Sequence, residues 1–199
     1  GVNISSTAGN LGVITVDGFT VQDWTSGGII QGMAAGPFAS LHVLNNVVYG
    51  PDTGATANGN GIQVSGNGSV VSGNKVFNDH LNSTDWSGSG IIVVNGSNIT
   101  VENNLVDGAD DGISVTNWNN TAGMSDIVIR DNTVSHATDE GISIQAFEGA
   151  FFGTPSGSIS SLTITGNTVT DSQSGLGIWD YSPTKDGVWA TTVADVSNN

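Results

Sequence analysis

One short pattern recurs five times along the chain and constrains the fold more than any other feature. It combines alternating apolar and polar residues, two variable residues, an Asn, one variable residue and a Val. It is clearest in "IVIRDNTV" from Ile127 and "LTITGNTV" from Leu162. Aligning the units on this Asn gives a repeat of about 30 residues. The recurring column holds Phe19, Asn46, Asn74, Asn104, Asn132, Asn167 and Asn199.

A second column accompanies the first, because each unit also contains a Gly followed by Ile. The pairs are Gly28-Ile29, Gly61-Ile62, Gly90-Ile91, Gly112-Ile113, Gly141-Ile142 and Gly177-Ile178. The segments between the two columns vary in length while the columns persist. This combination is typical of a solenoid whose strands are fixed in position and whose turns are free to vary.

The period within each unit is two, which indicates strands with alternating inward and outward side chains. Short strands in a unit of about 30 residues, without a helical stretch, predict an all-β solenoid, the parallel β-helix, with about six coils. The recurring Asn is expected to turn inward at a corner, where its amide can both donate and accept hydrogen bonds. The sequence therefore predicts an internal Asn ladder, and the Asn column is structural.

The "NxV…GIxV" pattern resembles the right-handed parallel β-helix repeat of the pectate-lyase-like superfamily over nearly the whole chain. The resemblance implies a right-handed coil, but it does not select a function, because lyases, glycosidases, epimerases, phage fibres and adhesins share this fold. We expect a single domain over residues 1–199. Enzymes of this superfamily usually begin with a capping helix, whereas this chain opens on "GVNI", so we expect an excerpt of a longer solenoid. Exposed coil ends would otherwise favour end-to-end self-association.

Charge narrows the range of partners. The chain has 18 acidic residues against 3 Lys and Arg, for a formal charge of -15. Such a surface repels nucleic acid and attracts cations such as Ca²⁺. No apolar run reaches the roughly 20 residues of a membrane-spanning helix, so membrane insertion is not expected. Sequons of the form Asn-x-Ser/Thr fit a secreted, extracellular or cell-surface protein, and they stand at Asn3, Asn67, Asn82, Asn95, Asn98 and Asn119.

Acidic pairs precede two consecutive Gly-Ile pairs, in "ADDGISV" and "TDEGISI". If the columns stack, Asp110 lies beside Asp139 and Asp111 lies beside Glu140, which places four carboxylates in one patch. Like charges at that spacing raise some pKa values and could supply the acid and base of glycoside hydrolysis. The same four residues could instead bind Ca²⁺, or could be ordinary turn residues.

Aromatic residues follow the acidic pairs in the same coils. Trp118 and Phe147 each stand six residues after the Gly and are expected to stack against a sugar ring. His136 enters the same coil as Asp139. Asp180 and Tyr181, in "WDYSP", are further candidates for sugar contact, whereas Trp179 is expected to cover the core or a loop.

The resemblance also bears on the reaction. The "DDG" is similar to the paired Asp of polygalacturonase-type glycosidases, which implies that Asp111 or Asp110 is the acid. The companion motifs are replaced by "SGSGI" and "DEG", and the basic residues that lyase-type elimination needs are scattered. The leading hypothesis is an extracellular module that recognises a polysaccharide or cell-surface glycan and could hydrolyse it, without a required cofactor. The alternative is a structural or adhesive surface protein that uses the solenoid as a rigid spacer.

Overall fold

A computed structural model describes residues 1–5, 12–24, 27–32, 39–50, 59–79, 88–118, 122–146, 157–180 and 194–197. These residues form strands and turns, and they contain no helix. In this part of the chain there is accordingly no helix with the length and apolarity needed to cross a membrane.

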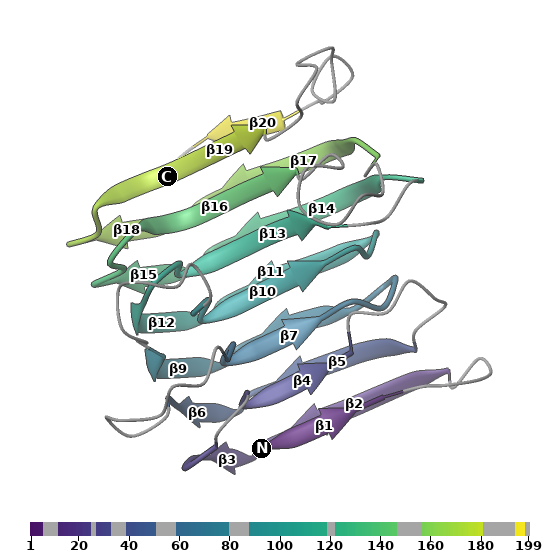
Figure 1. Ribbon diagram of the computed structural model, residues 1–199, viewed down its shortest axis with the longest axis vertical. Coiled ribbons are helices and arrows are strands. Elements are labelled where there is room, and N and C mark those ends of the chain that lie inside the picture. Colours follow the sequence, from purple (N-terminus) through teal and green to yellow (C-terminus); the bar gives the residue numbers. More distant parts are fainter. Residues whose placement is uncertain are drawn as a thin grey trace.

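The strands form three parallel sheets, here called sheets A, B and C (Figure 1). In spatial order, sheet A contains β1 (Val2–Ile4), β4 (Ile29–Gln31), β7 (Ile62–Val64), β10 (Ile91–Val94), β13 (Ile113–Asn117), β16 (Glu140–Ala146) and β19 (Ser174–Asp180). Sheet B contains β2 (Val13–Asp17), β5 (Ser40–Leu44), β8 (Val70–Ser72), β11 (Ile99–Glu102), β14 (Met124–Arg130), β17 (Ile159–Thr165) and β20 (Ala194–Ser197). Sheet C contains β3 (Thr20–Val21), β6 (Val47–Tyr49), β9 (Lys75–Asp79), β12 (Leu105–Ala109), β15 (Thr133–Ser135) and β18 (Thr168–Thr170).

Each coil contributes one strand to each sheet in the order A, B, C, and each strand pairs in parallel with its counterparts one coil away. The described residues therefore form six coils from β1 to β18, and β19 and β20 belong to a seventh. Neighbouring coils are spaced by the roughly 4.8 Å that separates paired strands. The predicted parallel β-helix is confirmed.

The core consists of stacked apolar side chains that point inward from the three sheets. Ile62, Ile91 and Ile113 occupy one column of sheet A and are fully buried. Val76, Val106 and Val134 form the corresponding column of sheet C. Each such side chain stabilises the fold by about 1.5–3 kcal/mol through removal of its surface from water.

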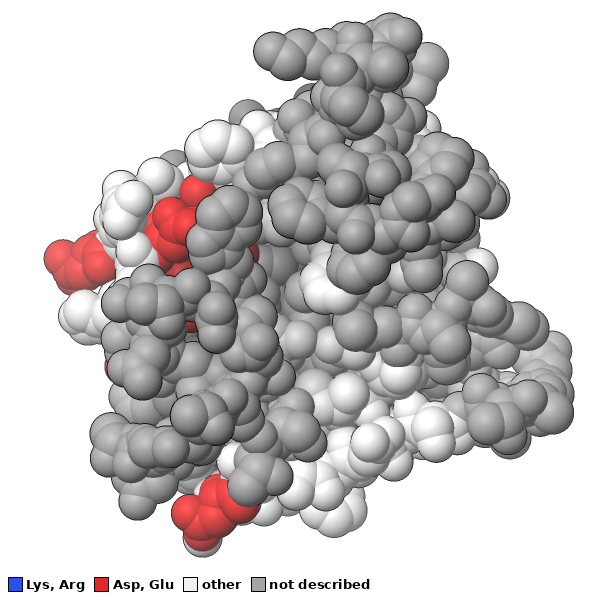
Figure 2. Space-filling model, viewed as in Figure 1, with Lys and Arg blue, Asp and Glu red and all other residues white. Residues whose placement is uncertain are grey.

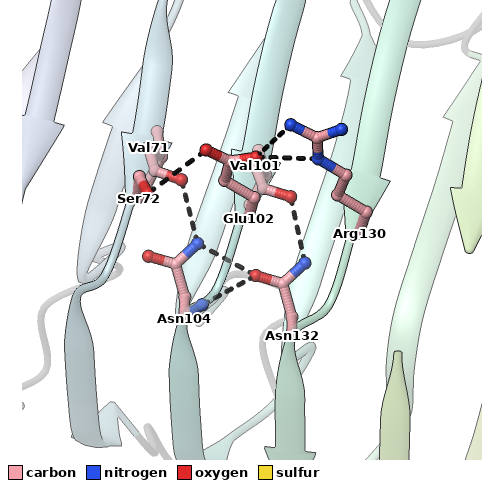
Figure 3. A network of polar contacts seen from close by, with 7 residues as sticks. All are labelled: Val71, Ser72, Val101, Glu102, Asn104, Arg130 and Asn132. Atoms are coloured by element: carbon pink, nitrogen blue, oxygen red, sulfur yellow. Dashed lines mark hydrogen bonds and ion pairs between the residues drawn. The ribbon is translucent and has the colours of Figure 1, made fainter. Parts of the chain in front are cut away.

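The Asn ladder is confirmed at the corner between sheets B and C. The Asn104 backbone N–H and the Asn104 amide Nδ2 both donate to the Oδ1 of Asn132, at 3.0 and 2.9 Å, and the amide also donates to the Val71 carbonyl at 3.0 Å (Figure 3). The remaining rungs are Asn46, Asn74 and Asn167, all buried. Phe19 occupies the predicted position in this column, because its N–H donates to Asn46 Oδ1 at 2.9 Å. Asn199 lies outside the described residues.

The residue before each ladder position explains how the chain makes this corner. Asn45, Asn103 and Asp131 have φ values of 53°, 54° and 55°, which is the left-handed region. Asn, Asp and Gly adopt that region at the lowest cost, and Gly stands at the same position in other coils. The turn chemistry is therefore repeated together with the ladder.

One part of the predicted Gly-Ile column is wrong. Ile142 pairs with Leu176 and Ile144 pairs with Ile178, so the last pair in the column is Gly175-Leu176 rather than Gly177-Ile178. The segment "GLGI" contains two Gly-apolar pairs two residues apart. A shift of two residues keeps every side chain on the same face of a strand, so alternation alone could not distinguish them.

Candidate functional site

The outer face of sheet A differs from an ordinary solvent-facing sheet surface. Its strands alternate between core-facing and outward-facing positions, yet the outward-facing Ser114, Thr116 and Ser143 are as buried as their core-facing neighbours. In Figure 2 acidic side chains gather near one edge at the level of β13 and β16, and a separate acidic group lies at the end of the molecule near β1. Among the described residues no Lys or Arg appears on this face (Figure 2).

A cluster of three carboxyl groups lies where β13 and β16 begin. Asp111, Asp139 and Glu140 each place a carboxylate oxygen within 4.8 Å of the other two. The strand register explains the cluster, because Gly112 N–H donates to the Glu140 carbonyl at 2.9 Å and Asp139 N–H donates to the Asp110 carbonyl at 3.0 Å. The predicted alignment of the two acidic pairs is therefore confirmed. We call these three residues the carboxyl cluster.

Asp110 is separated from the carboxyl cluster. Its side chain is only 8% exposed, and its Oδ1 accepts a hydrogen bond from the Thr138 hydroxyl at 2.7 Å. The carboxylate oxygens that lie within 4.8 Å of one another belong to Asp111, Asp139 and Glu140, and Asp110 is not among them. The cluster consequently contains three carboxyl groups rather than the four that the sequence suggested.

Hydrogen bonds hold Asp111 in place within the cluster. Its Oδ2 accepts from the Ser114 hydroxyl at 2.8 Å, and Ser89 donates in turn to Ser114 at 3.0 Å. Burial raises the pKa of Asp111, and the hydrogen bonds from Ser114 and Glu140 offset part of that rise. The polar side chains thus connect the carboxyl cluster to the outer face of sheet A.

Glu140 is the member of the cluster whose protonation is most perturbed. Burial, its hydrogen bond with Asp111 and the negative charges of Asp111 and Asp139 raise its pKa to about 7. Two carboxyl groups in such close contact cannot both ionise without mutual repulsion, so they hold a proton in common. At neutral pH the cluster therefore contains both a proton donor and a carboxylate.

Trp179 completes the site and was missed by the sequence analysis, which assigned it to covering the core or a loop. Its indole N–H donates to Glu140 Oε1 at 3.2 Å, and the residue is 44% exposed. Gly177 makes room for this contact, because a Cβ there would lie 2.6 Å from both Glu140 Cγ and Trp179 Nε1. The alternation of "LGIW" could have located it, since Trp179 must face outward if Leu176 and Ile178 face inward.

Trp118 lies at the opposite end of the same strand from the carboxyl cluster. All of β13 separates it from Asp111, a span of about 20 Å at the usual rise of a strand. Its backbone N–H donates to Asn95 Oδ1 at 2.8 Å. The backbone of Trp118 is therefore far along the strand from that of Asp111. Phe147 and Tyr181 lie outside the described residues, and the side chain of Asp180, at the end of β19, is not described.

His136 belongs to a different surface. It follows β15 of sheet C, and its Nδ1 lies 2.7 Å from Asp107 Oδ1. The hydrogen bond between the imidazole and the carboxylate raises the pKa of His136 and lowers that of Asp107. Its φ of 55° marks it as a turn residue. His136 thus forms a surface ion pair with Asp107 and has no contact with the carboxyl cluster among those described.

The carboxyl cluster is also the place where a cation could be held. Its three carboxyl groups offer oxygen ligands of the kind that Ca²⁺ prefers, and each can bind through one or both oxygens. The expectation of Ca²⁺ binding stays a prediction.

A family model described as the right handed beta helix region matches residues 1–189. The chain belongs to the right-handed β-helix family. The right-handed coil that the resemblance implied is thereby confirmed. No curated protein and no solved structure matches the sequence of this β-helix. Membership establishes the fold and leaves the chemistry to the residues of the site.

Proposed function

We propose that this β-helix recognises a polysaccharide along the outer face of sheet A and hydrolyses it at the carboxyl cluster. The observation that carries the proposal is the position of Trp179, an exposed indole hydrogen-bonded to Glu140 inside a group of three carboxyls. An aromatic face beside hydrogen-bonding groups suits a sugar ring, whose C–H face is apolar and whose rim carries hydroxyls.

The carboxyl cluster has the parts that glycoside hydrolysis requires. Glu140, with a pKa raised to about 7, is protonated in about half of the molecules at pH 7 and in this form would donate its proton to the glycosidic oxygen. Asp139 is exposed and would attack the anomeric carbon as its bond to the protonated leaving oxygen breaks. Water, deprotonated by Glu140, would then hydrolyse the glycosyl ester on Asp139 and restore the acid. Asp111 would favour the protonated form of Glu140, because their hydrogen bond raises the pKa of Glu140.

The spacing of the cluster favours one stereochemical course. Retaining glycosidases place their two carboxyl groups about 5–5.5 Å apart, while inverting enzymes leave about 6.5–9.5 Å for a water molecule. The oxygens of the carboxyl cluster lie within 4.8 Å of one another, which is closer to the retaining spacing than to the inverting one. We therefore expect retention of anomeric configuration, which proton NMR of the first products would reveal.

A glycan-array screen followed by product analysis of every hit tests the proposal. Glu140→Gln should abolish cleavage and keep the side-chain shape, and Asp139→Asn should do the same by removing the attacking carboxylate. Asp131→Asn is the matched control, because Asp131 is an exposed acid on a corner remote from sheet A. Unchanged hydrolysis in both cluster variants would refute the catalytic assignment, and absence of binding to any glycan would refute recognition.

A second candidate, an adhesive or spacer protein, is favoured by apolar side chains on the outermost described coils. Val13, Phe19 and Ile178 are 61%, 54% and 48% exposed. Apolar surface of this kind favours association with another chain, including end-to-end stacking of copies. Sedimentation over a range of concentrations would detect such assembly, and Ile178→Lys should weaken it. Both candidates are consistent with the strongly acidic composition of a secreted or cell-surface protein.

A further inference from the structure

The ring of Trp179 is oriented on the surface by its contact with Glu140. It is anchored at one end by the hydrogen bond from its N–H to Glu140, and Gly177 leaves the space between them. Its neighbour in the preceding coil is Gln145, whose amide donates to the Ser143 hydroxyl at 2.8 Å. An exposed aromatic ring in a fixed orientation binds sugar rings at low entropic cost, because little side-chain freedom remains to be lost.

The charge around this ring has one sign. The carboxyl cluster lies beside the indole, and no described Lys or Arg appears on this face of the molecule (Figure 2). The formal charge of the chain is -15. A ligand that brings a positive charge to this place would relieve the repulsion among Asp111, Asp139 and Glu140, whereas an anionic sugar would add to it.

We propose that Trp179 and the carboxyl cluster form a subsite for an amino sugar, in which the ring stacks on the indole and the ammonium group contacts the carboxylates. The inference rests on the proposed polysaccharide recognition and names the class of sugar. An ammonium group has three N–H donors and can satisfy three acceptors, and the cluster presents three carboxylate oxygens within 4.8 Å of one another. The indole face adds a cation–π attraction to the same charge.

Binding of an amino sugar at this subsite should change the number of protons bound to the protein. The proton that Asp111 and Glu140 hold in common occupies the place of a positive charge, so an incoming ammonium would displace it, and an amino sugar bound in this way would block cleavage rather than undergo it. Binding of a charged amino sugar should therefore release a proton to the buffer, whereas binding of the N-acetylated sugar should not. Calorimetry in buffers of different ionisation enthalpy measures this release directly.

The decisive comparison uses two ligands that differ only at nitrogen. Glucosamine hexamers, fully deacetylated, and N-acetylglucosamine hexamers would be titrated into the protein at mildly acidic pH, where the amine is charged. We expect the deacetylated hexamer to bind at least about tenfold more tightly. In Glu140→Gln this preference should shrink, while Trp179→Ala should weaken both ligands. Gly177→Ala, which crowds the indole, should resemble Trp179→Ala if the protein remains folded, as judged by circular dichroism.

The possible outcomes separate this inference from the proposed function. Equal affinity for both hexamers, or preference for the acetylated one, would overturn the amino-sugar subsite. Binding of other neutral glycans lost in Trp179→Ala would then still support polysaccharide recognition. If CaCl₂ alone binds with the same Glu140 dependence and no hexamer binds, the cluster is a cation site and the amino-sugar subsite is wrong. Asp131→Asn serves as the control for non-specific attraction to the acidic surface.

Discussion

At the residue scale, the ladder Asn side chains stabilise the fold by satisfying polar groups that the corner would otherwise bury. Each amide reaches the coil before it and the coil after it, as Asn104 does through Val71 and Asn132. An apolar residue of similar size would leave buried N–H and C=O groups without partners, and each such group costs about 1–3 kcal/mol. The ladder positions therefore require the hydrogen-bonding amide of Asn and not only a side chain of similar size.

Asn104→Ala should lower the free energy of unfolding by about 2–4 kcal/mol, because the backbone N–H of Asn74 loses its acceptor and the Val71 carbonyl loses its donor. Urea denaturation monitored by circular dichroism measures this change. Asn103→Gly is the control, since Asn103 is exposed and its φ of 54° suits Gly. A loss in Asn104→Ala no larger than in Asn103→Gly would contradict the structural role of the ladder.

Glu140 should make stability depend on pH in a defined window. Its pKa is about 7 in the folded protein and near the ordinary 4.5 in the unfolded chain. The folded state favours the protonated form, so this contribution is fully present below about pH 4.5 and is lost as pH rises toward 7. Glu140→Gln mimics the protonated form. This variant should therefore unfold at the same temperature as the parent protein in acid and at a higher temperature above pH 7. The corresponding gain in the free energy of unfolding above pH 7 is about 1–3 kcal/mol.

Thermal unfolding of both proteins across this range would measure the difference, and a constant offset between them at every pH would contradict the assignment. Asp126 offers a contrast, because hydrogen bonds from Ser161 and Ser125 lower its pKa. Asp126→Asn should consequently show no gain in stability above pH 7.

At the element scale, the Gly at or just before the start of a sheet A strand allows the coils to approach one another. A Cβ at Gly112 would overlap Val134 of sheet C and would lie 2.5 Å from the Gly141 carbonyl oxygen. Gly175 occupies the same column one coil beyond Gly141, yet a Cβ there would meet nothing within 4 Å. The same substitution at these two positions thus separates a steric cost from the intrinsic effect of losing a Gly.

Gly112→Ala should destabilise the protein by about 1–3 kcal/mol through overpacking. Gly175→Ala should be neutral or slightly stabilising, because Ala restricts the unfolded chain more than Gly does. Denaturant unfolding of the two variants side by side provides the measurement. Equal losses of stability in the two variants would show that the column requires Gly for its backbone flexibility rather than for lack of space.

The strands also show why the fold was predictable and the site only partly so. Repetition encodes the sheets, since the positions that place Asn132 beside Asn104 recur in every unit. The site depends instead on features that occur once. Whether Trp118 approaches Asp111 depends on β13 remaining extended, and whether Trp179 reaches Glu140 depends on the register of β19, which "GLGI" leaves open by two residues. Local patterns specify neither of these.

At the scale of the whole molecule, the β-helix is a one-dimensional stack. Each strand in the described part of the chain pairs with its counterparts in adjacent coils, and the three sheets follow the same order. The candidate site draws its residues from adjacent coils, with Asp111 before β13, Glu140 at the start of β16 and Trp179 in β19. Its geometry thus depends on the stacking of those coils and only weakly on distant ones.

This architecture predicts how a destabilising substitution in one coil affects local opening of the other coils. In a stack whose stability is a sum of coil and nearest-neighbour terms, a local defect raises the probability of opening most in the coils that touch it. Asn104→Ala removes a rung next to β11 and β12, so amide hydrogen exchange should accelerate in their partners β8, β9, β14 and β15. The increase should be smaller in β2 and β5, two coils or more away. Hydrogen exchange read by mass spectrometry on the folded variant would follow this gradient, with Asn103→Gly as the baseline. A uniform acceleration across all described strands would instead mean that the coils open together, and the carboxyl cluster would then be sensitive to mutations anywhere along the solenoid.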